Sequence, residues 1–91
     1  MKYQVQYTPV AIKQLKKMDD YTRKLIYAWI DKNVQGCNNP REQGKGLTAN
    51  HSGQWRYRIG DYRIIAEIQD EKVIVLIVNI GHRKEIYKNR G

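Results

Sequence analysis

The sequence predicts an α+β domain in which a two-helix hairpin packs on one face of a small, mostly antiparallel four-stranded sheet. Three observations support this fold class. A short alternating segment at the N-terminus precedes two helix-like segments with apolar stripes, and three strand-like segments follow a loop rich in glycine and asparagine. A Gly-Asp pair joins the first two of those three strands. The order β-α-α-β-β-β is typical of helices layered on a sheet, and we expect one domain over residues 1–91.

The N-terminal segment contains the first predicted strand and the start of the first helix. Tyr3, Val5 and Tyr7 alternate with polar residues, which predicts a strand with one buried face. Thr8 and Pro9 follow as a helix N-cap and a proline at the first helical position. The first helix is expected to bury one side and to expose the other: Ala11, Ile12, Leu15 and Met18 inside; Lys13, Gln14, Lys16 and Lys17 outside.

The second predicted helix follows Asp19 and Asp20, which end the first helix and can cap the next. Its buried face is expected to contain Tyr21, Leu25, Ala28 and Trp29, flanked by Ile26 and Ile30. Gly36 is a stop signal for this helix. The segment Gly36–Gly53 is rich in Gly, Asn and Pro and is expected to form a long loop, a feature that is often functional in so small a domain.

Three strands are predicted after the loop, over Gln54–Ile59, Tyr62–Gln69 and Val73–Ile80. The Gly-Asp pair between the first two is the kind of two-residue loop that forms a hairpin. The second turn is expected at Gln69–Lys72. The run Val73–Val78 is apolar without alternation, which predicts an interior strand with both faces covered.

The hairpin groups three arginines on one face of the predicted sheet. If Gly60 and Asp61 form the turn, Arg58 lies opposite Arg63, and strand alternation adds Arg56 to the same face. Like charges directly opposite each other destabilise a sheet, so this arrangement indicates that an anion binds there. The other face of the hairpin is apolar: Trp55, Tyr57, Ile59, Tyr62, Ile64, Ala66 and Ile68.

The chain that leaves the last predicted strand is expected to complete this site. With Gln69 opposite Lys72, antiparallel pairing places Val78 opposite Arg63, so that Gly81 and the residues after it emerge beside the first turn. The predicted site therefore consists of Arg56, Arg58, Arg63, His82, Arg83 and Tyr87.

This set of side chains suits phosphodiester chemistry without a metal. Arginine stays protonated and matches phosphate with a planar fork of donors, but it is a poor general base. The candidates for proton transfer are His82 and Tyr87. Tyr87 could instead stack on a splayed base, as could Trp55 or Tyr57 if their face were exposed. No metal site or other cofactor is predicted, because Cys37, His51 and His82 lack a zinc-ligand spacing.

The composition indicates a polyanionic partner. The formal net charge is +8, and both halves of the chain carry an excess of Lys and Arg. One cysteine excludes an internal disulfide, which fits a reducing cytoplasm. The N-terminus lacks the apolar run of a signal peptide, and no segment approaches transmembrane length, so we expect a cytoplasmic protein without a membrane partner.

Two sequence blocks, Arg56–Arg63 and Asn79–Tyr87, resemble toxins of the RelE/ParE toxin–antitoxin superfamily, specifically its RelE-type branch. The resemblance covers essentially the whole chain. It implies a ribosome-dependent endoribonuclease that cuts messenger RNA in the A site without a metal. The ribose 2′-hydroxyl would attack the neighbouring phosphate, giving a 2′,3′-cyclic phosphate and a 5′-hydroxyl. The residues of this chain that match the family's site are Arg56, Arg58, Arg63, Arg83 and Tyr87.

Three departures from the RelE pattern affect the implied roles. Arginines at 56 and 58 replace two lysines, His82 stands where RelE has a different basic residue, and Tyr87 is two residues closer to Arg83. The hypothesis is that Arg63 and Arg83 hold the scissile phosphate, while Arg56 and Arg58 stabilise transition-state charge and the messenger backbone. Tyr87 would orient or deprotonate the 2′-hydroxyl or stack on a base, and His82 would protonate the leaving 5′-oxygen.

Two other functions are possible on the same fold. One is a ParE-type inhibitor of DNA gyrase, and the other is a basic RNA-binding module without catalysis. The arginine, histidine and tyrosine set favours the nuclease, since ParE-type chains generally lack it. The expected partners are the ribosome with messenger RNA and a cognate antitoxin, which we expect to be acidic and partly disordered.

Overall fold

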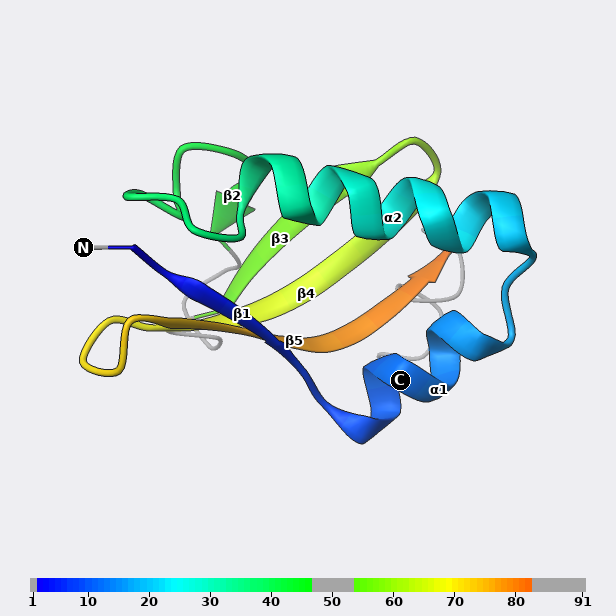
Figure 1. Ribbon diagram of the computed structural model, residues 1–91, viewed down its shortest axis with the longest axis horizontal. Helices are drawn as coiled ribbons and strands as arrows, with labels where there is room; N and C mark the ends of the chain where they lie inside the picture. The colour runs from blue at the N-terminus through cyan, green and yellow to red at the C-terminus, as the bar shows by residue number, and fades with distance from the viewer. Residues whose placement is uncertain (1, 47–53, 83–91) are drawn as a thin grey trace.

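The computed structural model describes residues 2–46 and 54–82, and both helices lie on one face of a mixed sheet (Figure 1). Within the described residues the sheet has five strands in the order β1-β5-β4-β3-β2. β1 runs parallel to β5, and the other pairings are antiparallel. The elements are β1 Gln4–Tyr7, α1 Pro9–Lys16, α2 Asp20–Asn33, β2 Lys45–Gly46, β3 Gln54–Ile59, β4 Tyr62–Gln69 and β5 Ile74–His82.

The predicted fold class is confirmed, but the sheet contains one strand more than the predicted four. The additional strand, β2, lies in the segment that was expected to be loop and pairs with the edge of β3. Gly44 precedes it with a φ of 81°, and a Cβ at Gly44 would lie 2.2 Å from the carbonyl oxygen of Arg56. Two residues are too few to produce a period-2 pattern, so sequence alternation could not reveal this strand.

The helix starts follow the predicted caps. The Thr8 side chain accepts a hydrogen bond from the Ala11 amide, and the Asp19 side chain accepts one from the Thr22 amide. Each cap satisfies a backbone donor that has no partner within its helix. The two helices therefore begin where the sequence predicted. α1 ends at Lys16, and Lys17 is its C-cap residue.

The buried faces of the helices differ in part from the prediction. In α1, Ala11 and Leu15 are buried as expected, whereas Ile12 is 39% exposed. In α2, Ile26 and Ile30 are buried, and the buried series continues to Val34, the C-cap residue. Tyr21, at 75% exposed, and Leu25, at 44% exposed, were expected to be buried but face solvent. Both stripes of α2 are apolar at helical spacing, and the branched aliphatic stripe is the one that packs on the sheet.

The first hairpin has the predicted register. Ile59 pairs with Tyr62, Arg58 with Arg63, and Tyr57 with Ile64, and Gly60 in the turn has a φ of 58°. The apolar face of the hairpin joins the helices in one core, whose largest fully buried side chains include Tyr57, Leu15, Ile26, Ile30 and Ile64.

The second turn is two residues longer than predicted, which shifts the register of the last strand. Gln69 pairs with Ile74 instead of Lys72, and Val73 occupies the turn with a φ of 57°. A β-bulge in β5 adds a further shift, because Val78 is an additional residue between the pairs Ile65–Asn79 and Ala66–Ile77. β5 consequently extends to His82, and Arg63 lies opposite Gly81 rather than Val78.

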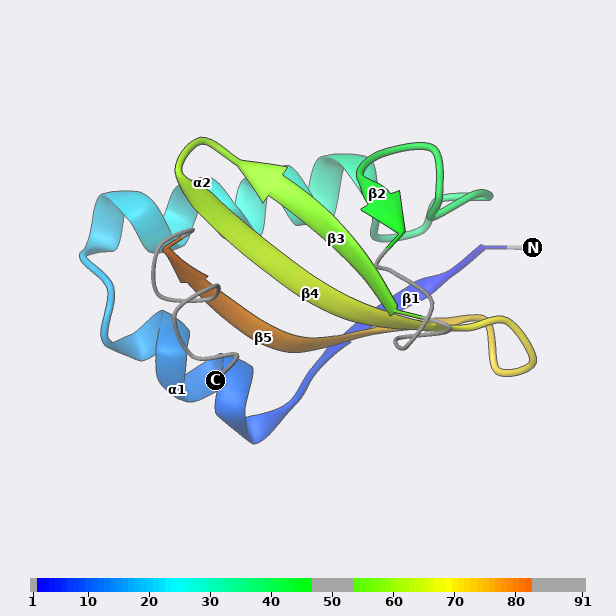
Figure 2. The ribbon, with the colours of Figure 1, turned by 180° about the vertical axis from the view of Figure 1, so that it is seen from behind.

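β5 is an interior strand, between β1 and β4, as predicted. Its two faces are unequally covered, because Val75 and Ile77 are buried whereas Ile74, Leu76 and Val78 are only half-buried. The expectation that both faces are covered is therefore wrong. No helix of the described residues covers the opposite face of the sheet, which faces the viewer in Figure 2.

Candidate functional site

Three arginines share the face of the sheet that the helices leave open. Arg58 and Arg63 are direct cross-strand partners in β3 and β4, and Arg56 lies two residues before Arg58 on the same face. Arg58 is exposed and Arg56 is half-buried. We call this surface of Arg56, Arg58 and Arg63 the arginine face. It concentrates positive charge at a position where sheet stability alone would favour opposite charges.

Arg63 is the most buried of the three, with only 7% of its surface exposed. Its Nη1 lies 3.5 Å from the carbonyl oxygen of Gly60 and 3.4 Å from that of Tyr62, so these contacts are long. Its buried Nε has no hydrogen-bond partner in the part of the chain that the structure describes. A buried guanidinium with incompletely satisfied donors is costly for the fold, and an anion that accepts from it would offset that cost.

The short strand β2 brings a fourth cation to this surface. Lys45 pairs directly with Arg56, so its side chain extends from the same face. Lys45 belongs to the segment that was expected to be loop, and the only sequence signal for it was its position between two glycines. The Lys45–Arg56 register therefore places the charge of Lys45 beside the arginine face.

His82 lies near the arginines in register but on the other side of the sheet. It pairs with Tyr62, whose side chain belongs to the helix-facing side, and the two rings meet edge to face with centroids 5.7 Å apart. The sequence analysis placed His82 on the same face as the arginines. The bulge in the β4–β5 pairing reverses which side chains of β5 point to each face, so His82 lies on the other face of the sheet.

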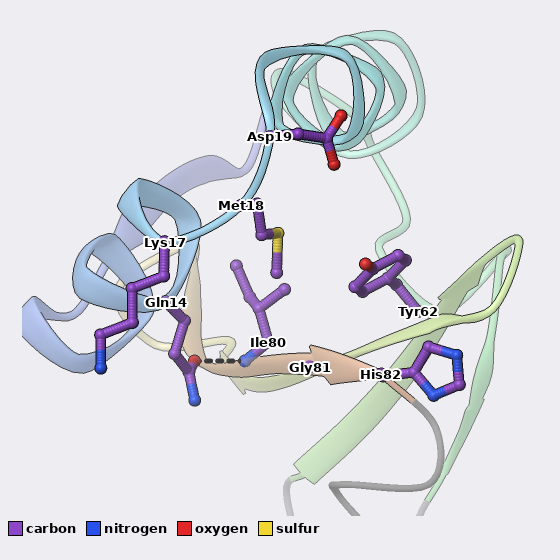
Figure 3. Close-up of a pocket in the computed structure, with 8 residues that line it drawn as sticks. All are labelled: Gln14, Lys17, Met18, Asp19, Tyr62, Ile80, Gly81 and His82. Atoms are coloured by element: carbon purple, nitrogen blue, oxygen red, sulfur yellow. Dashed lines mark hydrogen bonds between the residues drawn. The ribbon is translucent and has the colours of Figure 1, made fainter.

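A pocket of about 550 Å³ lies beside His82, between the end of α1 and the ends of β4 and β5 (Figure 3). Polar and apolar groups both contribute to it, which gives it no single chemical character. Its lining residues are Gln14, Lys17, Met18, Asp19, Tyr62, Ile80, Gly81 and His82.

Gln14 was expected on the solvent side of its helix but is bonded to β5. Its Oε1 accepts a hydrogen bond from the Ile80 amide at 2.6 Å, and its Nε2 donates to Oδ1 of Asn79 at 2.6 Å. Both partners come directly before Gly81, the residue opposite Arg63. Sequence reasoning missed Gln14 because a glutamine on a helix is ordinarily a solvated residue.

The aromatic residues of β3 are held by the fold. Tyr57 is fully buried, donates a hydrogen bond to the carbonyl oxygen of Pro40 at 2.6 Å and packs on Trp29. Burial raises the pKa of the Tyr57 hydroxyl. The alternative in which Tyr57 stacks on a base is therefore wrong. Trp55 is half-buried, and its Nε1 donates to the carbonyl oxygen of Gln43 at 2.5 Å.

The remaining predicted site residues, Arg83 and Tyr87, lie outside the described residues, as does His51. Burial is the main cause that raises the pKa of the Cys37 thiol, so this thiol is less reactive than a free one. Among residues 2–46 and 54–82 there is no cluster of three or more His, Cys, Asp or Glu side chains that could hold a metal ion. Neither described helix is long and apolar enough to cross a membrane.

The family described as the ParE toxin of the type II toxin–antitoxin system parDE matches residues 5–87 of this chain. A curated relative, Toxin RelG of Mycobacterium tuberculosis, is 28% identical over 88 residues, covering 97% of this chain and 99% of that protein.

Solved structures of toxins have the same fold. The RelBE2 toxin–antitoxin complex from M. tuberculosis matches with a TM-score of 0.78 and 26% identity, over 91% of this chain and 93% of that chain. A mutant of the E. coli toxin RelE in the free state matches with a TM-score of 0.74 and 22% identity, over 97% of this chain and 93% of that chain. The intact E. coli RelBE complex matches with a TM-score of 0.73 and 20% identity, over 88% and 95%.

Proposed function

The chain belongs to the RelE/ParE superfamily of type II toxins, and we propose that it is a messenger RNA endonuclease of the RelE branch that acts in the ribosomal A site. In this proposal the 2′-hydroxyl loses its proton and attacks the adjacent phosphorus, and the P–O5′ bond breaks. The leaving 5′-oxygen takes up a proton. The products are a 2′,3′-cyclic phosphate and a 5′-hydroxyl, and the result is inhibition of translation in the cytoplasm.

The observation that carries the proposal is the Arg58–Arg63 cross-strand pair on the sheet face opposite the two helices. The fold places these two guanidinium groups directly opposite each other. One of them, that of Arg63, is buried, and its Nε has no hydrogen-bond partner among the described residues. Forked donors in fixed positions suit the non-bridging oxygens of a phosphate and the charge that develops on them during in-line attack. Arg56 and Lys45 extend the positive surface along β3 and β2, in a direction that the messenger backbone could follow.

Proton transfer requires groups other than arginine, because the guanidinium pKa is too high for a general base. The proposal assigns the 2′-hydroxyl to Tyr87 and a further phosphate contact to Arg83. His82 remains the proposed acid for the leaving oxygen only if the RNA bends around the end of β5, since His82 lies on the Tyr62 side of the sheet. Replacing His82 with alanine tests this: unchanged cleavage of messenger RNA on programmed ribosomes would remove His82 from the mechanism.

The proposed neutralising partner is a cognate antitoxin. Solved relatives include toxin–antitoxin complexes such as RelBE2 and RelBE. The net charge of +8 favours an acidic segment, which we propose is disordered in part until it binds.

A second function is favoured by one observation, which is that the matching family is described by ParE toxins. A chain of this kind would inhibit DNA gyrase by binding it. Expression of the chain without an antitoxin, followed by mapping of messenger RNA 5′ ends, separates the two functions. Cuts at codon positions within translated frames support the nuclease. Intact messengers accompanied by DNA damage would establish the gyrase inhibitor instead.

A further inference from the structure

The Gln14 side chain joins α1 to β5 at a point where β5 has lost its strand neighbour. The β1–β5 pairing ends at Tyr7 and Ile77, and Thr8 then donates its amide to the Ile77 carbonyl. Three residues further along β5, Gln14 Oε1 accepts from the Ile80 amide at 2.6 Å, as Figure 3 shows. A helix side chain thus takes the place of the missing strand as acceptor for a backbone donor.

The same region of β5 contains the bulge. The register passes from Ala66 opposite Ile77 to Ile65 opposite Asn79, so Val78 is the additional residue in β5. Without the bulge, the register of the Ala66–Ile77 pair would continue along β5 and would place Ile80 opposite Arg63. With it, Ile80 lies opposite Ile64 in the core, and Gly81 lies opposite Arg63. The bulge therefore exchanges an isoleucine for a glycine beside the buried guanidinium.

We propose that Gln14 is a positioning residue of the arginine face: it holds the β5 bulge that keeps Gly81 beside Arg63. The inference rests on the proposed function, in which Arg63 binds the scissile phosphate. A glycine presents no side chain there, so the phosphate can approach the guanidinium. Gln14 acts through the backbone of Ile80 and the side chain of Asn79, with which its Nε2 is bonded at 2.6 Å.

Two variants at this position separate hydrogen bonding from packing. Gln14→Met keeps the length of the side chain but offers only a weak thioether acceptor to the Ile80 amide. Gln14→Glu keeps the acceptor, and the Asn79 amide can turn over to donate to the second carboxylate oxygen. We therefore expect Gln14→Met to loosen the bulge and Gln14→Glu to retain it.

Gln35→Met is the matched control. Gln35 Oε1 accepts from the Val5 amide at 2.8 Å, and its Nε2 donates to Gln4 at 2.8 Å, so it also supports a strand backbone. Val5 lies in β1, the edge strand that does not adjoin the arginine face. The control thus removes a glutamine that also bonds to a strand backbone, but at a distance from the arginine face.

The experiment measures single-turnover messenger RNA cleavage on programmed ribosomes together with amide hydrogen exchange by NMR. For Gln14→Met we expect faster exchange at Ile80 and a cleavage rate constant lower by about tenfold or more, as is typical of small displacements in a catalytic site. The half-saturating ribosome concentration should stay unchanged, because in this inference Gln14 acts on the position of β5 rather than by binding RNA itself. Gln14→Glu and Gln35→Met should cleave at nearly the wild-type rate.

Equal cleavage rates for Gln14→Met and Gln35→Met would overturn the inference about Gln14. Cleavage by the wild-type chain in the same experiment would still support the proposed function. Unchanged exchange at Ile80 in Gln14→Met would also overturn it, because the bulge would then not depend on Gln14. Failure of the wild-type chain to cleave at all would instead refute the proposed function, and with it the role of Gln14.

Discussion

At the scale of single residues, Arg63 combines burial with incomplete hydrogen bonding. It is 7% exposed, and its Nε has no partner among the described residues. Structural arginines are usually satisfied by carboxylates or carbonyls, as Arg41 is by both oxygens of Asp70. The contrast between these two arginines fits the proposal that Arg63 binds the phosphate of the substrate, whereas Arg41 supports the fold.

Replacement of Arg63 should therefore separate activity from stability. For Arg63→Met we expect the cleavage rate constant to fall about a hundredfold, in the range seen when one donor to a developing negative charge is removed. The free energy of unfolding should stay the same or rise, because a buried and incompletely bonded charge is removed. Urea denaturation and single-turnover cleavage on ribosomes measure the two quantities.

Arg41→Met is the control for this prediction, and it should show the opposite behaviour. It removes a two-contact pair with Asp70 at 3.0 and 2.9 Å and should lower stability while leaving cleavage unchanged. A large loss of stability in Arg63→Met would mean that Arg63 is a structural residue after all.

At the scale of elements, the strand β2 depends on Gly44. The φ of Gly44 is 81°, and a Cβ there would lie 2.2 Å from the Arg56 carbonyl oxygen and 2.8 Å from Nε1 of Trp55. We expect Gly44→Ala to detach β2 from β3, which would remove Lys45 from the arginine face. The expected results are weaker binding to ribosomes and a free energy of unfolding lower by about 2 kcal/mol or more, since the clash adds to the ordinary penalty for a left-handed residue.

Gly36→Ala provides the comparison within the same chain. Gly36 also has a positive φ, 74°, but a Cβ there would meet no atom within 4 Å. We expect Gly36→Ala to lower the free energy of unfolding by only about 1–2 kcal/mol, the cost of a Cβ in the left-handed conformation. Ribosome binding should stay unchanged. Equal binding by both variants would show that β2 and Lys45 do not contribute to the site.

The elements also show which parts of this fold the sequence could predict. The first hairpin was predictable because its register depends on a local signal, the Gly60–Asp61 turn between two alternating strands. The β4–β5 register was not, because it depends on Val73 with a positive φ and on a bulge, and neither has a sequence signature in this chain. The predicted face for His82 was wrong for that reason, and the hydrogen bonds of Gln14 to β5 were missed because they depend on tertiary packing.

At the scale of the whole molecule, hydrogen bonds among Tyr3, Arg41 and Asp70 join three segments that are distant in the sequence. This polar junction lies at the end of the sheet away from the Gly60–Asp61 turn. Asp70, in the β4–β5 turn, accepts from the Tyr3 hydroxyl at 2.6 Å and from both terminal nitrogens of Arg41. The hydrogen bonds from Arg41, followed by that from Tyr3, lower the pKa of the Asp70 carboxyl. The junction links β1 and the segment after α2 to the sheet without touching the arginine face.

This junction predicts a pH dependence of stability. Because the pKa of Asp70 is lower in the folded chain than its unfolded value of about 3.9, its contribution is present above that value. The contribution is lost as the pH falls through the folded pKa. The free energy of unfolding of the wild-type chain should therefore decline more steeply below about pH 4 than that of Asp70→Asn. Parallel urea denaturation curves from pH 2 to 7 measure this difference, and identical slopes would show that the junction does not couple to folding.

The distribution of charge over the molecule fits the proposed partners. Both helices cover one face of the sheet (Figures 1 and 2). The strand register places Arg58 and Arg63 on the other face, so the candidate site lies on the side of the sheet away from the core. In the proposed function, the net charge of +8 would attract ribosomal RNA and an acidic antitoxin over long range, and the arrangement of arginines would provide the chemistry. The composition alone predicted the positive charge, whereas the hairpin register was needed to predict that the arginines share one face.

The most direct test of the proposed endonuclease combines the purified chain with ribosomes that hold a defined messenger, in buffer containing a metal chelator that leaves the ribosomes assembled. We expect a cut within the A-site codon of the messenger, with a 2′,3′-cyclic phosphate on the upstream fragment and a 5′-hydroxyl on the downstream one. We also expect Arg58→Ala and Arg63→Ala to cut far more slowly. An intact messenger, together with inhibition of purified DNA gyrase by the same preparation, would contradict the proposed endonuclease activity.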